Sequence, residues 1–158
     1  MASDKHVVIL AADLFEDAEL LYPLWRLQEA EVETTLAGVS DSPVSGKKGH
    51  GPVEVDTTVE KVDADDVDLL VIPGGFAPDK LRQSEDVLAL VRDLDAAGTP
   101  IAFICHAGWV PISAGIISGR RATSVGAIKD DMVNAGCDWT DEATVVDGNL
   151  ISARHPGD

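Results

Sequence analysis

The chain has 158 residues, a length that fits one domain with a full hydrophobic core. Its 28 Asp and Glu residues outnumber 12 Lys and Arg, for a formal net charge of −16. Such a field repels phosphate groups, so we expect neither nucleic acid nor an anionic membrane surface as a partner. The carboxylates are spread from Asp4 to Asp158, which favours a surface adapted to high salt, as in a halophile, over a patch for a basic partner.

The sequence also bears on compartment and cofactors. No apolar run reaches the 18 residues of a membrane span, and the first five residues lack a signal-peptide pattern. The two cysteines, Cys105 and Cys137, form neither a Cys-x-x-Cys motif nor a disulfide framework, so we predict a cytoplasmic protein. No metal-ligand spacing, Gly-x-Gly-x-x-Gly motif or P-loop occurs, so we expect no metal and no nucleotide cofactor.

The first half of the chain predicts strands that alternate with a helix. Residues 6–12 are a short apolar run rich in β-branched side chains, which predicts a buried strand. A helical pattern follows over 13–30, and a second strand is predicted over 32–37. Residues 40–52 are rich in Gly, Ser and Pro, which predicts turns or a small hairpin before a short edge strand at 53–55.

The second half continues the alternation. The predicted strands cover 68–73, 100–104, 123–125, 143–146 and 150–153, and the predicted helices cover 85–97, 107–118 and 127–135. Asp147-Gly148-Asn149 separates the last two strands and is typical of a hairpin. Continuous apolar strands between helices predict one α/β domain over residues 1–158, with a mostly parallel sheet covered on both faces.

Cys105 is the strongest candidate for chemistry. In an open α/β sheet, ligands bind beyond the carboxyl ends of the strands, and Cys105 follows such a strand directly. A cysteine between a strand and a helix start has the placement of a nucleophile elbow, where free helix N–H groups stabilise a thiolate. The adjacent His106 can serve as a base once another group orients it. The alternative is a buried cysteine that acts as a small apolar side chain.

Two more segments reach the same edge of the predicted sheet. Gly74-Gly75 permits a positive φ, so an N–H group there can join that of His106 in an oxyanion hole. Glu16 follows the first strand and can face the same crevice, where burial and a thiolate would raise its pKa. Its alternative is one acidic residue among many in the first turn of a helix. Cys137 has no activating neighbour, and we interpret it as structural.

Several short motifs, in their order and spacing, resemble the DJ/ThiJ/PfpI superfamily and, within it, the PfpI-like intracellular proteases. They cover nearly the whole chain and comprise 12–20 with Tyr22-Pro23, 45–51, 72–78, 104–106, 112–115, 126–131 and 146–149. The resemblance implies a flavodoxin-like sandwich, similar to class I glutamine amidotransferases, with Cys105 as nucleophile. It further implies a protonated Glu16 beside the cysteine, a catalytic His106, and an oxyanion hole from the N–H groups of Gly75 and His106.

Two positions depart from the family pattern. In PfpI-like members a glutamate of a neighbouring subunit orients the histidine, and the matching residue here is the shorter Asp79. The resemblance therefore implies a homo-oligomer, a dimer or higher, in which Asp79 completes the site. The family usually has Gly-Pro after Cys-His, whereas Ala107-Gly108-Trp109 stands here. We expect a substrate pocket at Gly74 that Trp109 reshapes.

The resemblance implies a cysteine-dependent hydrolase without a cofactor, acting on a small carbonyl compound or a peptide. Family members are described as peptidases, glyoxalases and protein deglycases, and the sequence leaves these open because all three use the same thiolate. A second hypothesis is an oxidative-stress sensor or chaperone-like protein in which an accessible, low-pKa Cys105 is oxidised. A glutamine amidotransferase is disfavoured because it needs a His-x-Glu motif, and Gly157 follows His155 at that spacing.

Overall fold

The computed structural model describes residues 3–158. Its strands are β1 Ser3–Ala11, β2 Val32–Gly38, β3 Thr57–Thr58, β4 Leu69–Ile72, β5 Ile101–Ile104, β6 Arg121–Ala122, β7 Asp138–Trp139, β8 Thr144–Asp147 and β9 Leu150–Ala153. One seven-stranded sheet has the order β3-β2-β1-β4-β5-β9-β8, and β6 pairs with β7 separately. Every neighbouring pair in the large sheet is parallel except β8 with β9, which form the predicted hairpin.

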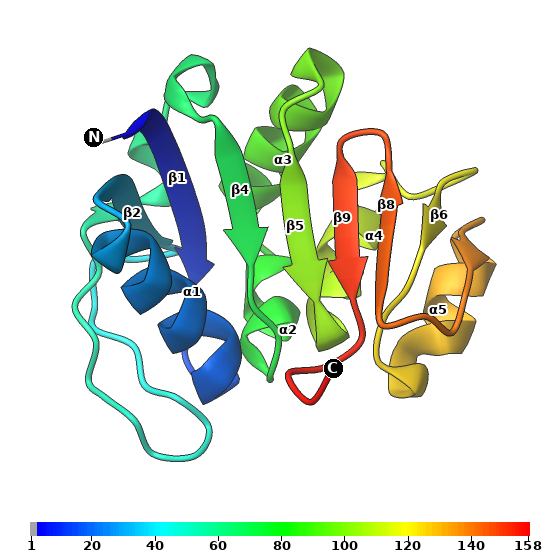
Figure 1. The fold of residues 1–158 in the computed structure, drawn as a ribbon, viewed down its shortest axis with the longest axis horizontal. Helices are drawn as coiled ribbons and strands as arrows, with labels where there is room; N and C mark the ends of the chain where they lie inside the picture. The colour runs from blue at the N-terminus through cyan, green and yellow to red at the C-terminus, as the bar shows by residue number, and fades with distance from the viewer. Residues whose placement is uncertain (1–2) are drawn as a thin grey trace.

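Helices lie on both faces of the sheet, as predicted. The α-helices are α1 Asp17–Glu29, α2 Ala77–Leu81, α3 Glu85–Ala97, α4 Trp109–Ala114 and α5 Lys129–Asn134. Figure 1 shows α1 in front of the sheet and α3 and α4 behind it. The carboxyl ends of the parallel strands meet at the lower edge in this view, where α2 also lies. Among residues 3–158, no helix combines the length and the apolar character needed to cross a bilayer.

The apolar run of β1 is buried on both faces of the sheet, whereas buried and half-buried residues alternate along β4, β5 and β9, whose second face is less covered. Successive side chains of β1 point to opposite faces of the sheet, and Val8, Ile9 and Leu10 are all fully buried. The helix α3 presents a buried stripe to the sheet and has the predicted ends. At its start the Ser84 hydroxyl accepts the N–H of Val87, and at its end Gly98 has a φ of 74°.

Several elements differ from the sequence-based expectation. The strand expected over 123–125 lies instead at β6 Arg121–Ala122, because the N–H of Thr123 donates to the Ser152 hydroxyl at 2.9 Å and not to a strand partner. The helix expected from residue 13 begins only at Asp17, because Leu14 adopts a left-handed φ of 65°. The expected helix over 107–118 is a 3₁₀ turn, Cys105–Gly108, followed by the short α4, which ends because Gly115 turns left-handed at a φ of 78°. The expected edge strand at 53–55 lies instead at β3, since Val53 pairs antiparallel with Val44 in a turn. The helix α2 was not predicted.

Candidate active site

The geometry of a nucleophile elbow is present at Cys105. The residue ends β5 and opens the turn Cys105–Gly108, and its φ is 62°. A left-handed backbone at a residue with a side chain costs about 1–2 kcal/mol, so the surrounding fold must hold it there. Cys105 is 8% exposed. The turn therefore carries the thiol to the carboxyl edge of the sheet while keeping it largely covered.

Backbone N–H groups from two elements converge on the sulfur. Hydrogen bonds from the N–H groups of His106 and Gly75 to Cys105 both lower the pKa of its thiol. Gly75 follows β4 with a φ of 78°, and a Cβ there would stand 2.3 Å from the Glu16 nitrogen. Only glycine therefore fits. These donors, which are the pair expected from the sequence, can also hold an oxyanion formed beside Sγ.

The carboxyl group beside the cysteine belongs to Glu19, so the prediction of Glu16 in this place was wrong. Glu19 lies in the first turn of α1, is 4% exposed, and its Oε2 accepts the N–H of Gly74 at 2.7 Å. Burial raises the pKa of Glu19 to about 7, and the carboxyl lies beside the Cys105 thiol, with its Oε1 buried and without a hydrogen-bond partner among the described residues. A Cβ on Gly74 would lie 2.5 Å from Glu19 Oε2 and 2.9 Å from Cys105 Cβ, so glycine permits this close approach.

Glu16 has a different task. Its carboxylate accepts the ammonium of Lys47 at 2.6 Å and that of Lys48 at 2.5 Å. Burial alone would raise the pKa of Glu16, but the two lysines outweigh burial and lower it. Glu16 is therefore ionised and paired away from the sulfur. The sequence did not separate Glu19 from Glu16, and only the structure shows that Glu19 is buried in α1 beside Leu20 and Leu21.

The protonation states of Cys105 and Glu19 depend on each other. Burial raises the pKa of the Cys105 thiol to about 11, and a negative charge on Glu19 contributes to the rise. Two adjacent anions in a buried site repel each other, so a thiolate is stabilised when Glu19 carries the proton. The backbone N–H groups lower the pKa of the thiol, as predicted, but burial raises this pKa by more. Burial therefore raises the pKa of Cys105, opposite in direction to the low pKa that we expected.

His106 lies beside the thiol, with Nδ1 3.3 Å from Sγ. Burial and the positive charge of Lys47 lower the pKa of His106, which favours a neutral ring able to take up a proton. Asp79 is exposed on α2. In the described part of one chain it forms no hydrogen bond with His106.

The segment that follows β2 brings a cation to the site, which sequence reasoning missed. The Asp17 carboxylate accepts the N–H of Lys48 at 2.9 Å, and the N–H of Lys47 donates to the Phe15 carbonyl at 2.9 Å. The Lys47 ammonium also stands 5.8 Å from the centre of the Phe76 ring. The hydrogen bond to Glu16 raises the pKa of Lys47 against the opposing effect of burial, and negative charge at Cys105 and Glu19 contributes to the rise.

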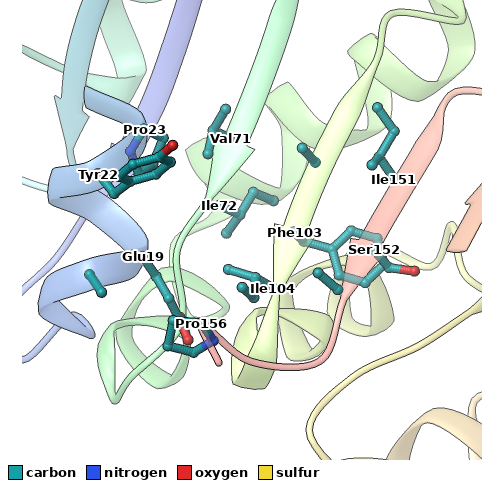
Figure 2. A pocket seen from close by; sticks show the side chains of 13 residues that line it. Glu19, Tyr22, Pro23, Val71, Ile72, Phe103, Ile104, Ile151, Ser152 and Pro156 are labelled. Atoms are coloured by element: carbon teal, nitrogen blue, oxygen red, sulfur yellow. The ribbon is translucent and has the colours of Figure 1, made fainter. Parts of the chain in front are cut away.

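The expected pocket residues do not share one cavity. A groove of about 480 Å³ lies between α1 and the uncovered face of β4, β5 and β9. Figure 2 shows Tyr22 and Phe103 among its mostly apolar walls, with Glu19 at its edge. Neither Gly74 nor Trp109 lines this groove. Gly74 packs against Cys105, and Trp109 contacts the His106 ring, with ring centroids 5.3 Å apart.

The site residues thus fall into groups that the fold brings together and groups that it separates. Cys105, His106, Gly75 and Glu19 meet at the carboxyl edge of the sheet. Among residues 3–158, no three His, Cys, Asp or Glu side chains are grouped as metal ligands would be. The assembled groups can add a sulfur nucleophile to an electrophilic carbon, hold the resulting oxyanion and move a proton.

Comparison with known proteins places the chain. The DJ-1/PfpI family profile matches residues 5–158. The chain is 47% identical to a deglycase of Pyrococcus abyssi and 45% identical to the deglycase PfpI of Pyrococcus furiosus, in each case over 96% of this chain and 91% of the relative. The crystal structure of Drosophila melanogaster DJ-1beta superposes with a TM-score of 0.90 at 31% identity, covering 99% of this chain and 84% of that one. The flavodoxin-like arrangement is confirmed, and the chain belongs to the DJ-1/PfpI family.

Proposed function

We propose that this protein is a cysteine-dependent hydrolase of the deglycase type, which removes a small carbonyl adduct from an amine or a thiol. The observation that carries the proposal is the strained Cys105, whose sulfur faces two backbone N–H groups and a buried Glu19 with a pKa of about 7. A carboxyl group that titrates near neutral pH is suited to both release and uptake of a proton. The names of the Pyrococcus relatives support the substrate class.

The geometry supports a covalent route. The proton of the Cys105 thiol passes to Glu19 or to His106, and Sγ adds to a carbonyl carbon. As the S–C bond forms, the carbonyl electron pair moves to oxygen, which accepts hydrogen bonds from the N–H groups of Gly75 and His106. The carbonyl carbon is that of the aldehyde which forms when the amine or thiol leaves the adduct with the hydroxyl proton, so addition gives a hemithioacetal on Sγ. Glu19 then takes the hydrogen of this carbon as a proton and returns it to the neighbouring carbonyl carbon, which turns the sulfur-bound carbon into a thioester carbon without an external oxidant. Water adds to the thioester carbon, the C–S bond breaks, and a hydroxy acid and the thiol are released.

We also propose that the working protein is a homo-oligomer in which Asp79 of one subunit approaches His106 of another. Two features support this arrangement: Asp79 is exposed, and among residues 3–158 the only hydrogen bond of the His106 ring is the one from Nδ1 to the sulfur, with none at Nε2. Gel filtration and light scattering at low and at multimolar salt test the assembly, and a monomer under both conditions would refute it.

A hydrolase fits the site better than a redox sensor does. Oxidation to a sulfinate proceeds through the thiolate, and burial raises the pKa of Cys105 well above its ordinary value of 9.0. Attack on a bound substrate can begin from the thiol, because His106 and Glu19 lie beside the sulfur to take up its proton.

The decisive experiment compares two cysteine variants. Cys105→Ala should abolish turnover of methylglyoxal adducts of N-acetylcysteine and N-acetyllysine, while Cys137→Ala, which removes the other buried cysteine, should leave it unchanged. Methylglyoxal alone and short peptides are run in parallel, at low and multimolar salt. Undiminished turnover by Cys105→Ala refutes the proposal. Turnover of peptides only would make the protein a peptidase, and no turnover with two oxygens added at Cys105 would make it a sensor.

A further inference from the structure

Within one chain, the imidazole ring of His106 has two described contacts, one with the Cys105 sulfur and one with an aromatic ring. Its side chain can rotate about two bonds, and the contact of Nδ1 with Sγ, at 3.3 Å, is a single and weak restraint. The ring has one aromatic neighbour in the described part of the chain, the indole of Trp109. The two ring centroids are 5.3 Å apart, and the planes meet at 64°, an edge-to-face contact.

Two other side chains, those of Asp131 and Arg82, contact the Trp109 indole. Its ring N–H donates to Asp131 Oδ2 at 2.9 Å, and the Arg82 guanidinium lies 5.4 Å from the ring centre. The Arg82 side chain is fixed in turn, because its Nε donates to the Ser113 hydroxyl at 2.9 Å. Three elements therefore converge on one indole: α5 through Asp131, the end of α2 through Arg82, and α4, which Trp109 begins.

We propose that Trp109, anchored by Asp131, is a positioning residue that fixes the His106 ring with Nδ1 toward the Cys105 sulfur. This inference rests on the proposed function, and it gives Trp109 a task other than lining a substrate pocket. It also gives a task to Asp131, the last residue of the motif 126–131, which the chemistry at Cys105 does not use.

The contacts favour positioning over a plain structural role. Asp131 is exposed at the start of α5, so its bond to the indole contributes little to the core and acts mainly on the orientation of the ring. Its neighbour Asp130 occupies the same first helical turn, is equally exposed and makes no hydrogen bond to Trp109. The two carboxylates thus form a matched pair in which only one reaches the indole.

The first test follows His106 directly by ¹⁵N-histidine NMR, without any substrate. We expect one dominant tautomer in the unchanged protein, and averaged ring signals with a pKa closer to 6.5 in Asp131→Ala and Trp109→Ala. Trp109→Phe keeps an aromatic edge and should retain part of the order. Asp130→Ala should change nothing. Unchanged His106 signals in both Asp131→Ala and Trp109→Ala overturn the proposal.

The chain contains a second Trp–His pair that controls for aromatic contact as such. Trp25 and His50 meet edge to face at 5.7 Å and 70°, and Trp25 is exposed on α1. Trp25→Ala should perturb the signals of His50 alone and leave turnover unchanged. If it perturbs His106 as strongly as Trp109→Ala does, the effect is general loosening and the proposal fails.

The second test is a double-mutant cycle on turnover. Trp109→Ala should lower kcat about 10-fold to 100-fold with little change in KM, the cost of misplacing a reacting group. In a His106→Ala background the same change should have little further effect, because its target is gone. Additive losses in the two variants, or a rise in KM alone, would contradict the proposal and indicate that Trp109 lines the substrate pocket. A protein without turnover refutes the proposed function, whereas the NMR result still decides the role of Trp109.

Discussion

Glu19→Gln should make the protein more stable above neutral pH while removing its activity. The carboxyl is buried and its pKa is about 7, against an ordinary value of 4.5. Between these values the folded protein keeps a proton that the unfolded chain releases, so the free energy of unfolding falls as the pH rises through this window. Glutamine is neutral at every pH, and its amide oxygen can still accept the N–H of Gly74.

The size of the effect follows from the pKa. A tenfold change in proton affinity is worth about 1.4 kcal/mol, so a rise from 4.5 to about 7 costs the folded state about 3 kcal/mol above neutral pH. Glu19→Gln should recover up to about this amount near pH 8 and much less near pH 5. Loss of the exchangeable proton should lower turnover about 100-fold or more.

Urea denaturation of both proteins at about pH 5 and about pH 8 measures the effect, and the difference between variants removes the contribution of the other acidic groups. Glu16→Gln is a matched control three residues away. Lys47 and Lys48 lower the pKa of Glu16, so its replacement should bring no gain at pH 8. If Glu19→Gln and the unchanged protein lose the same stability between the two pH values, the carboxyl is not protonated in the folded state.

Three further predictions concern the same site. Cys105→Gly should be about 1 kcal/mol more stable than Cys105→Ala in chemical denaturation, because only glycine relieves the φ of 62°; equal stability would mean that the turn is unstrained. Gly74→Ala should abolish turnover and lower the melting temperature, because a Cβ would displace Glu19; full activity would contradict the packing. Lys47→Met should raise the pKa of His106 in an NMR titration and move the acidic limb of the pH–rate profile upward, since the ammonium now lowers that pKa; an unmoved titration would refute the coupling.

Local features of the sequence predicted most of the architecture. The continuous apolar runs indicated buried parallel strands, Ser84 and Gly98 marked the ends of α3, and Asp147-Gly148-Asn149 marked the hairpin. These signals act within a few residues and hold wherever the segment packs. The short helix α2 was not predicted because five residues show too little hydrophobic periodicity. The helix predicted after Cys105 was too long because Gly115 ends α4 early.

The sequence predicted those site residues whose position after a strand was enough to place them at the site. Cys105, His106 and Gly75 were found because each lies within three residues of the end of a strand, and both strands end at the same edge of the sheet. Glu16 and Glu19 could not be told apart in this way, since both lie near the start of one helix. Their roles depend on which neighbour each carboxyl meets in space.

The acidic composition by itself determined that most carboxylates must lie at the surface, because a chain with a net charge of −16 cannot bury many unpaired anions. It could not say which carboxyl is the exception. The tertiary structure decided that Glu16 is neutralised by two lysines, whereas Glu19 is enclosed against Gly74 and Cys105. The pKa of a carboxyl depends on burial and on neighbouring charge, and both are set by contacts between segments far apart in the chain.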